Sequence, residues 1–248
     1  MTRTARENSE SGVYHVIIKG DGGMDIFHDD RDRFAFLATL DDLLIESRIS
    51  LFAWCLMSNH VHLLIEDPGQ QMGRFMQRLC TSYAKRFNTI AGRTGSVFQD
   101  RYFSVPIKTE EQLIRCVLYI HDNPLKGMGI HPKYYFWCSY REYIGTPERI
   151  APDLMLSLLD GADGFKAATD DMRLKTYYVK QGSKVADDEL DCAVRSVLGD
   201  MDPATIKNKP KAERARLIKA LKAAGLTFKQ IQRKTGMGEK TIMRDCRS

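Results

Sequence analysis

Two histidines one residue apart open an apolar run in the stretch SNHVHLLIE. Residues i and i+2 of a strand point to the same face, so His60 and His62 would present two imidazoles side by side while Val61 and Leu63 pack behind the sheet. Two neutral imidazoles at that spacing can bind one divalent metal ion. The pattern also fits two half-buried polar residues on a strand, so the pair alone leaves both interpretations open.

A tyrosine and an amide share one face of a later helix, in the segment RCVLYIHDNP. Tyr119 and Asn123 are four residues apart, whereas His121 points elsewhere. A metal ion held by His60, His62 and the Asn123 amide oxygen would polarise a phosphodiester, and Tyr119 would attack the phosphorus to give a phosphotyrosine link. No nucleotide cofactor is needed, because this link conserves the energy of the broken bond. Such an ion would be Mg²⁺ or Mn²⁺. The competing interpretation of Tyr119 is a core residue with a solvated hydroxyl.

The elements that must position these residues alternate between strand and helix patterns. Strands are predicted over residues 14–19, 49–57 and 60–66, the last two as a hairpin, and a fourth within residues 96–108. Helices are predicted over residues 30–47, 72–90 and 110–122, the last ending at Asn123-Pro124 because a residue before proline resists the α conformation. The pattern predicts an α+β domain over residues 1–147 with a mainly antiparallel sheet and helices packed on it.

The rest of the chain has a different charge pattern. Residues 148–202 are predicted to be a helical connector with an acidic end, whereas residues 203–248 contain thirteen Lys and Arg against three acids. Helices predicted over residues 211–224, 228–235 and 239–246 have the spacing of a small all-α helix-turn-helix domain that would bind duplex DNA. Its expected DNA-contacting residues are Lys229, Arg233, Lys240, Thr241 and Arg244.

Composition limits the class of protein. A chain of 248 residues with 43% hydrophobic residues can form a substantial core. No apolar run approaches the roughly 18 to 20 residues of a membrane span, and MTRTARENSES lacks the apolar stretch of a signal peptide, so we expect a cytoplasmic protein without a membrane partner. Scattered cysteines with no C-x-x-C pair predict reduced, mostly buried thiols; they are Cys55, Cys80, Cys116, Cys138, Cys192 and Cys246.

Five motifs occur in order between about residues 12 and 145: YHVIIKGDGGMDIF, WCLMSNHVHLLIE, SVFQDRYFS, YIHDNP and WCSYREYIG. In these motifs the chain resembles the HUH single-strand DNA transposases with one catalytic tyrosine, and within them the REP-associated tyrosine transposases. The resemblance implies a ferredoxin-like α+β core, His60 and His62 as metal ligands, Tyr119 as nucleophile and Asn123 completing the metal site. The chain departs from the family at Ser58, where proline is common, and simpler relatives have glutamine where Asn123 stands.

The resemblance implies a metal-dependent endonuclease and strand transferase that acts on hairpins of repetitive palindromic single-stranded DNA. Tyr119 would keep the 5′-phosphate and release a 3′-hydroxyl, and joining would reverse the reaction. Two alternatives stay open: a DNA-binding regulator that retains the nuclease core as a scaffold, and a related HUH nickase of replication or plasmid transfer. A homodimer also stays open, because relatives differ on whether the tyrosine helix serves its own subunit or a partner's.

Further candidates for DNA binding lie in the first domain. A single-strand binder needs cations for phosphates and aromatic rings for unpaired bases. The candidates for phosphate contacts are Arg78, Lys85, Arg86 and Arg101, and those for base stacking are Tyr83 and Tyr102.

Overall fold

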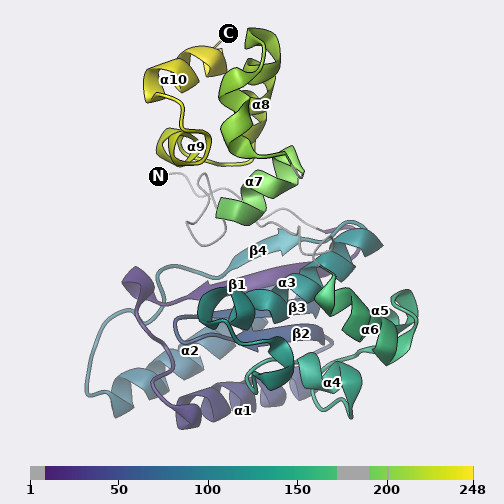
Figure 1. Ribbon diagram of the computed structural model, residues 1–248. Helices are drawn as coiled ribbons and strands as arrows, with labels where there is room; N and C mark the ends of the chain where they lie inside the picture. Colours follow the sequence, from purple (N-terminus) through teal and green to yellow (C-terminus); the bar gives the residue numbers. More distant parts are fainter. Residues whose placement is uncertain (1–8, 172–189, 200, 248) are drawn as a thin grey trace. The chain divides into compact units, whose positions relative to one another are not determined.

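The chain divides into two compact units, Met1–Leu174 and Lys175–Ser248. The computed structural model describes residues 9–171, 190–199 and 201–247 (Figure 1). No helix in these residues is long and apolar enough to cross a membrane.

The first unit is built on a four-stranded sheet with strand order β2-β3-β1-β4. The strands are β1 (Val13–Lys19), β2 (Ser50–Leu56), β3 (His60–Glu66) and β4 (Phe103–Pro106), and every neighbouring pair is antiparallel. Together with the helices this confirms the predicted α+β class. The central strands β1 and β3 are buried along almost their whole length, so they bring their side chains into the core from both faces.

Three long helices pack on this sheet. Helix α1 (Asp30–Glu46) contacts α2 (Met72–Ile90) and β2, and Figure 1 shows α1 and α2 along the same side of the sheet. Helix α3 (Glu110–Met128) contacts β2 and β3. Short 3-10 helices lie at Asp21–Gly23 and Pro132–Tyr134. Since α3 contains Tyr119, its contact with β3 is what brings the tyrosine to the histidine strand.

The prediction that this helix ends at Asn123-Pro124 was wrong, because α3 continues to Met128. Pro124 has no N–H and so cannot bond to the carbonyl of Ile120, the usual partner one turn back. The side-chain Nδ2 of Asn123 donates to that carbonyl at 3.3 Å and to the Tyr119 carbonyl at 2.9 Å. The helix ends instead at Gly129, whose φ of 68° is the left-handed conformation that suits glycine.

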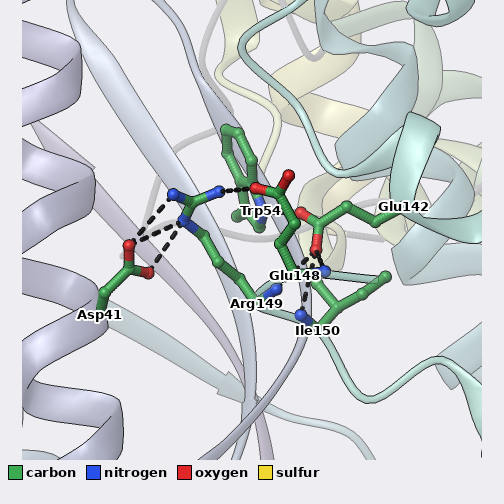
Figure 2. Close-up of polar contacts among 6 residues, drawn as sticks. All are labelled: Asp41, Trp54, Glu142, Glu148, Arg149 and Ile150. Atoms are coloured by element: carbon green, nitrogen blue, oxygen red, sulfur yellow. Dashed lines mark hydrogen bonds and ion pairs between the residues drawn. The ribbon is translucent and has the colours of Figure 1, made fainter. Parts of the chain in front are cut away.

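The segment after α3 is tied to the sheet by one buried carboxylate, Glu142 of α4 (Tyr140–Ile144) (Figure 2). Its Oε1 accepts from Trp54 Nε1 at 2.8 Å, and its Oε2 accepts from the backbone N–H groups of Glu148 and Arg149 at 2.8 and 2.7 Å. A fourth, longer hydrogen bond joins Ile150 N to Oε2 at 3.3 Å. Hydrogen bonds to a carboxylate are stronger than those between neutral groups.

The open side of β2 is covered by this same segment. Leu56 N donates to Trp137 O at 2.8 Å, and Ala151 N donates to Leu51 O at 2.8 Å. Beyond it, α5 (Asp153–Leu158) and α6 (Gly161–Asp170) pack on α3, and α6 also contacts α4. The predicted division of the chain at residues 147 and 202 stays a prediction.

The second unit is all helical in its described residues. It comprises α7 (Leu190–Leu198), a 3-10 helix (Pro203–Asn208), α8 (Lys211–Ala223), α9 (Phe228–Thr235) and α10 (Glu239–Arg247). Thr227 starts α9 with a capping box to Gln230, and Gly236 ends it at a φ of 66°. The helices share one apolar core that includes Val194, Ile218 and Ile242.

Candidate active site

His60 and His62 lie on the same face of β3, as their spacing predicts. Their ring centroids are 4.9 Å apart and the rings are nearly perpendicular. His60 is half-buried at the start of the strand, and its Nδ1 lies 2.7 Å from Asn59 Oδ1. Since an amide oxygen only accepts, His60 Nδ1 is the protonated nitrogen and Nε2 keeps its lone pair.

His62 is buried and meets a third histidine that sequence reasoning did not assign. His62 Nδ1 and His15 Nε2 are 2.9 Å apart, and the two rings stack with centroids 5.1 Å apart. Burial lowers the pKa of His62 well below its usual value, with smaller effects from His60, His15, Lys19 and Lys126. Burial also lowers the pKa of His15 to about 3. Both imidazoles are therefore neutral at ordinary pH, the form that binds metal ions.

Tyr119 of α3 brings its ring against this histidine pair. The ring centroid lies 5.6 Å from that of His62 and 5.8 Å from that of His15, with edge-to-face geometry in both cases. The Lys126 ammonium lies 4.4 Å from the Tyr119 ring centroid and 3.4 Å from Asp122 Oδ2. The structure thus assembles the tyrosine and a cation from α3, the two predicted histidines from β3, and His15 from β1.

Asn123 follows Tyr119 by one turn of α3 and is half-buried. Its amide nitrogen donates hydrogen bonds to the carbonyls of Tyr119 and Ile120. This orientation leaves the amide oxygen as the atom that could bind a cation. The side chain therefore has a structural role in the helix that is separate from any role in metal binding.

The donor set fits a divalent cation. The Nε2 of His60 has a lone pair, and the Nε2 of His62 has one when its Nδ1 donates to His15, while Asn123 would contribute an oxygen. Among the described residues, no three His, Cys, Asp or Glu side chains are grouped to hold a metal ion, so the third protein ligand would have to be an amide or another oxygen. Mixed imidazole and oxygen ligands suit Mn²⁺, and Mg²⁺ less strongly.

Three of the residues predicted to bind DNA surround one groove. Lys85 and Arg101 are exposed at its wall, and Tyr102 is half-buried in it. The groove lies between α2 and residues 95–102.

The other candidates of this unit lie elsewhere. Arg78 forms an exposed ion pair with Glu46 at 2.7 Å, and Arg86 is half-buried on α2. Tyr83 is only 2% exposed, its hydroxyl donates to Ile26 O, and its ring packs on Phe36. The Tyr83 ring therefore has no face available for an unpaired base, and we leave it out of the proposed DNA contacts. Its i, i+4 apolar neighbours on α2 are the sequence signal that it belongs to the core.

The candidates in the second unit lie on the surface of α9 and α10. Lys229, Arg233, Lys240 and Arg244 are exposed and Thr241 is half-buried. On the other side of α10, Asp245 is buried and accepts from Arg214 of α8. The exposed cations therefore lie on two successive helices, α9 and α10, which are joined by the turn Gly236-Met237-Gly238.

Comparison with known proteins gives one family. Residues 8–123 match the family described as transposase IS200 like. A structure of a REP-associated tyrosine transposase bound to a REP hairpin is 15% identical, with a TM-score of 0.49, over 62% of this chain and 93% of that chain. A crystal structure of a proposed transposase from Deinococcus radiodurans R1 is 19% identical, with a TM-score of 0.35, over 49% of this chain and 97% of that chain. No curated protein sequence matches the chain.

Proposed function

Residues 8–123 match the IS200-like transposase family, and on that premise we propose that the chain is a metal-dependent single-strand DNA endonuclease and strand transferase. Its substrates would be hairpins of palindromic DNA. The observation that carries the proposal is the contact of the Tyr119 ring with both His62 and His15, since these residues come from three separate elements. The strand order and the two crossover helices also support a ferredoxin-like core.

The chemistry assigns a role to each side chain of the site. His60, His62 and the Asn123 oxygen would hold a divalent ion, which when bound supplies positive charge to the non-bridging oxygens of the scissile phosphodiester. His15 would fix the ring of His62 through the Nδ1 contact. Lys126, beside the Tyr119 ring, would add a second positive charge at the phosphate.

The bonds that change are those of the Tyr119 phenol and of the scissile phosphodiester. Attack of Tyr119 Oη forms an oxygen–phosphorus bond and breaks the bond to the 3′-oxygen of the neighbouring nucleotide. The proton that the phenol loses is balanced by the one gained by the released 3′-hydroxyl. Attack of a second 3′-hydroxyl on the phosphotyrosine would reverse these steps and join two strands without a nucleotide cofactor.

The second unit would bind duplex DNA. Its exposed cations on α9 and α10, with the net positive charge of residues 203–248, support this role. The small apolar core with a capped α9 and a glycine turn before α10 supports a helix-turn-helix arrangement.

The test is formation of a covalent protein–DNA adduct. Single-stranded hairpins from the sequences that flank the gene are incubated with the protein and Mn²⁺ or Mg²⁺, and the products are separated on a denaturing gel. We expect a shifted band that disappears with Tyr119→Phe, with His60→Ala, with His62→Ala and with a chelator. Tyr134→Phe is the matched control, because Tyr134 is a 71% exposed tyrosine outside the site.

Retention of the band in Tyr119→Phe would remove Tyr119 as nucleophile. Activity that persists in both histidine variants and in chelator would remove the metal. Absence of any adduct on all hairpins, with tight binding of duplex DNA, would favour a DNA-binding regulator that keeps the nuclease fold as a scaffold.

A further inference from the structure

A groove of about 900 Å³ lies between α2 and residues 95–102. One wall is apolar and aromatic, with Phe98 and Tyr102, and the α2 wall includes Met76 and Ala84. Amide groups of Gln77, Asn88 and Gln99 line it as well. This volume is at the upper end of the roughly 300–1,000 Å³ typical of sites for small organic ligands.

The side chains that line this groove carry more positive than negative charge. From Pro68 to Gln99 the chain contains no acidic residue, and it contains five cations; these are Arg74, Arg78, Lys85, Arg86 and Arg93. At the groove itself Lys85 and Arg101 are exposed, and Asp100 is its one acidic side chain. Two exposed cations, Lys85 and Arg101, beside aromatic and amide groups fit a polyanion whose units include flat rings. An acidic peptide would use the cations but would leave the aromatic wall without a stacking partner.

The backbone pairing relates this groove to His60. Lys19 of β1 pairs with His60 of β3, and on its other side Lys19 O accepts from Gln99 N at 3.0 Å. The loop that lines the groove is therefore two strand spacings from the histidine strand, about 10 Å between backbones. Stacked nucleotides rise about 3.4 Å each along a strand, so about three nucleotides span this separation between the backbones.

We propose that this groove binds unpaired nucleotides of the DNA strand next to the cleaved phosphodiester, with Lys85 and Arg101 on their phosphates and the Tyr102 ring against a base. The proposal rests on the proposed function for the position of the cleaved bond, and it adds where the single strand is held. The proposal assigns phosphate contacts to Lys85 and Arg101 but not to Arg78. Arg78 is on α2 like Lys85, but it lies outside the groove and pairs with Glu46.

The experiment measures binding without cleavage. The full chain with Tyr119→Phe is titrated with fluorescent oligo-dT of twelve nucleotides and with a duplex of the same length, and anisotropy is recorded at several salt concentrations. Lys85→Ala with Arg101→Ala should weaken single-strand binding by about tenfold or more and reduce the salt dependence of log K by about 1.4, since each single-strand phosphate contact contributes about 0.7. Duplex affinity and the melting temperature should not change.

Arg78→Ala is the matched control and should leave single-strand affinity unchanged. Equal single-strand affinity in the double variant and the parent, or an equal loss in Arg78→Ala, would overturn the proposal. If the double variant lowers the melting temperature, Lys85→Gln with Arg101→Gln is used and the same salt dependence decides. The adduct assay reports separately on the proposed function. Loss of single-strand affinity in the double variant, with no adduct from the parent, would support the groove as a binding site and reject the nuclease. An adduct from the parent, with no loss of affinity in the double variant, would support the nuclease and reject the groove.

Discussion

The histidines of the site differ in what holds each ring. His60 is oriented by its sequence neighbour Asn59, whereas His62 is oriented by His15 from the adjacent strand. Partners that orient a metal-binding imidazole contribute to affinity although they do not touch the ion. His15 is therefore expected to act as a positioning residue.

The residue-scale prediction is that His15→Phe weakens binding of Mn²⁺ about 10- to 100-fold, the usual effect of losing such a partner. Phenylalanine keeps a ring in the buried position but cannot hydrogen-bond to His62. Free Mn²⁺ is measured by electron paramagnetic resonance during titration of the full chain. His28→Phe is the control, because His28 is an exposed residue in the loop before α1. Equal affinity in His15→Phe and the parent would contradict the positioning role.

Helix α3 is the element that connects fold and chemistry, and it carries a proline inside its last turns. In the proposal Asn123 faces the metal site. Its amide nitrogen also donates to the Ile120 carbonyl in place of the N–H that Pro124 lacks. A single substitution of Asn123 therefore mixes two effects, and a second substitution can separate them.

The element-scale prediction is that Asn123→Ala lowers the free energy of unfolding by about 1 kcal/mol, because it leaves the Ile120 carbonyl without its partner. Pro124→Ala in the same chain adds an N–H that can bond to Ile120, so the double variant should recover most of this stability in urea unfolding. It should not recover Mn²⁺-dependent adduct formation. Recovery of both would show that Asn123 is needed only for the helix.

Much of these elements follows from sequence patterns. Residues 60–66 and 72–90 were predicted with the observed bounds, because alternation and i, i+4 spacing of apolar residues are local signals. The contact of His15 with His62 depends on the register between β1 and β3, which no local pattern contains. The continuation of α3 past Pro124 depends on one side-chain hydrogen bond that competes with the general rule for proline. The burial of Tyr83 and Glu142 depends on tertiary packing.

At the scale of the whole molecule, each unit has a hydrophobic core of its own. In the second unit, the buried Asp245 carboxylate bonds to Arg214 and connects α10 with α8. The Arg214 hydrogen bond is the main reason that the pKa of Asp245 lies below its usual value of 3.8. A carboxyl with a lowered pKa stabilises the folded state fully above its unfolded pKa, and this contribution is lost as the pH falls through the lowered value.

The prediction at this scale is that Asp245→Asn lowers the melting temperature of the second unit and leaves the first unit unchanged. Between pH 5 and 8 the loss should be constant, since Asp245 is ionised throughout, and below about pH 4 the difference between variant and parent should shrink. Calorimetry with two transitions checks both statements. A loss shared equally by the two transitions, or one that grows in acid, would contradict the assignment.

The covering of β2 by residues after α3 has a consequence during synthesis. Strand β2 is complete at Leu56, but the groups that bond to its open side come from Trp137 and Ala151. A nascent chain with fewer residues exposes a strand edge that can pair with another chain. Since synthesis proceeds from the N-terminus, almost a hundred residues must be added after Leu56 before all the groups that pair with this edge are present. Chains stalled or truncated at residue 123 should therefore depend on chaperones far more than the full chain does.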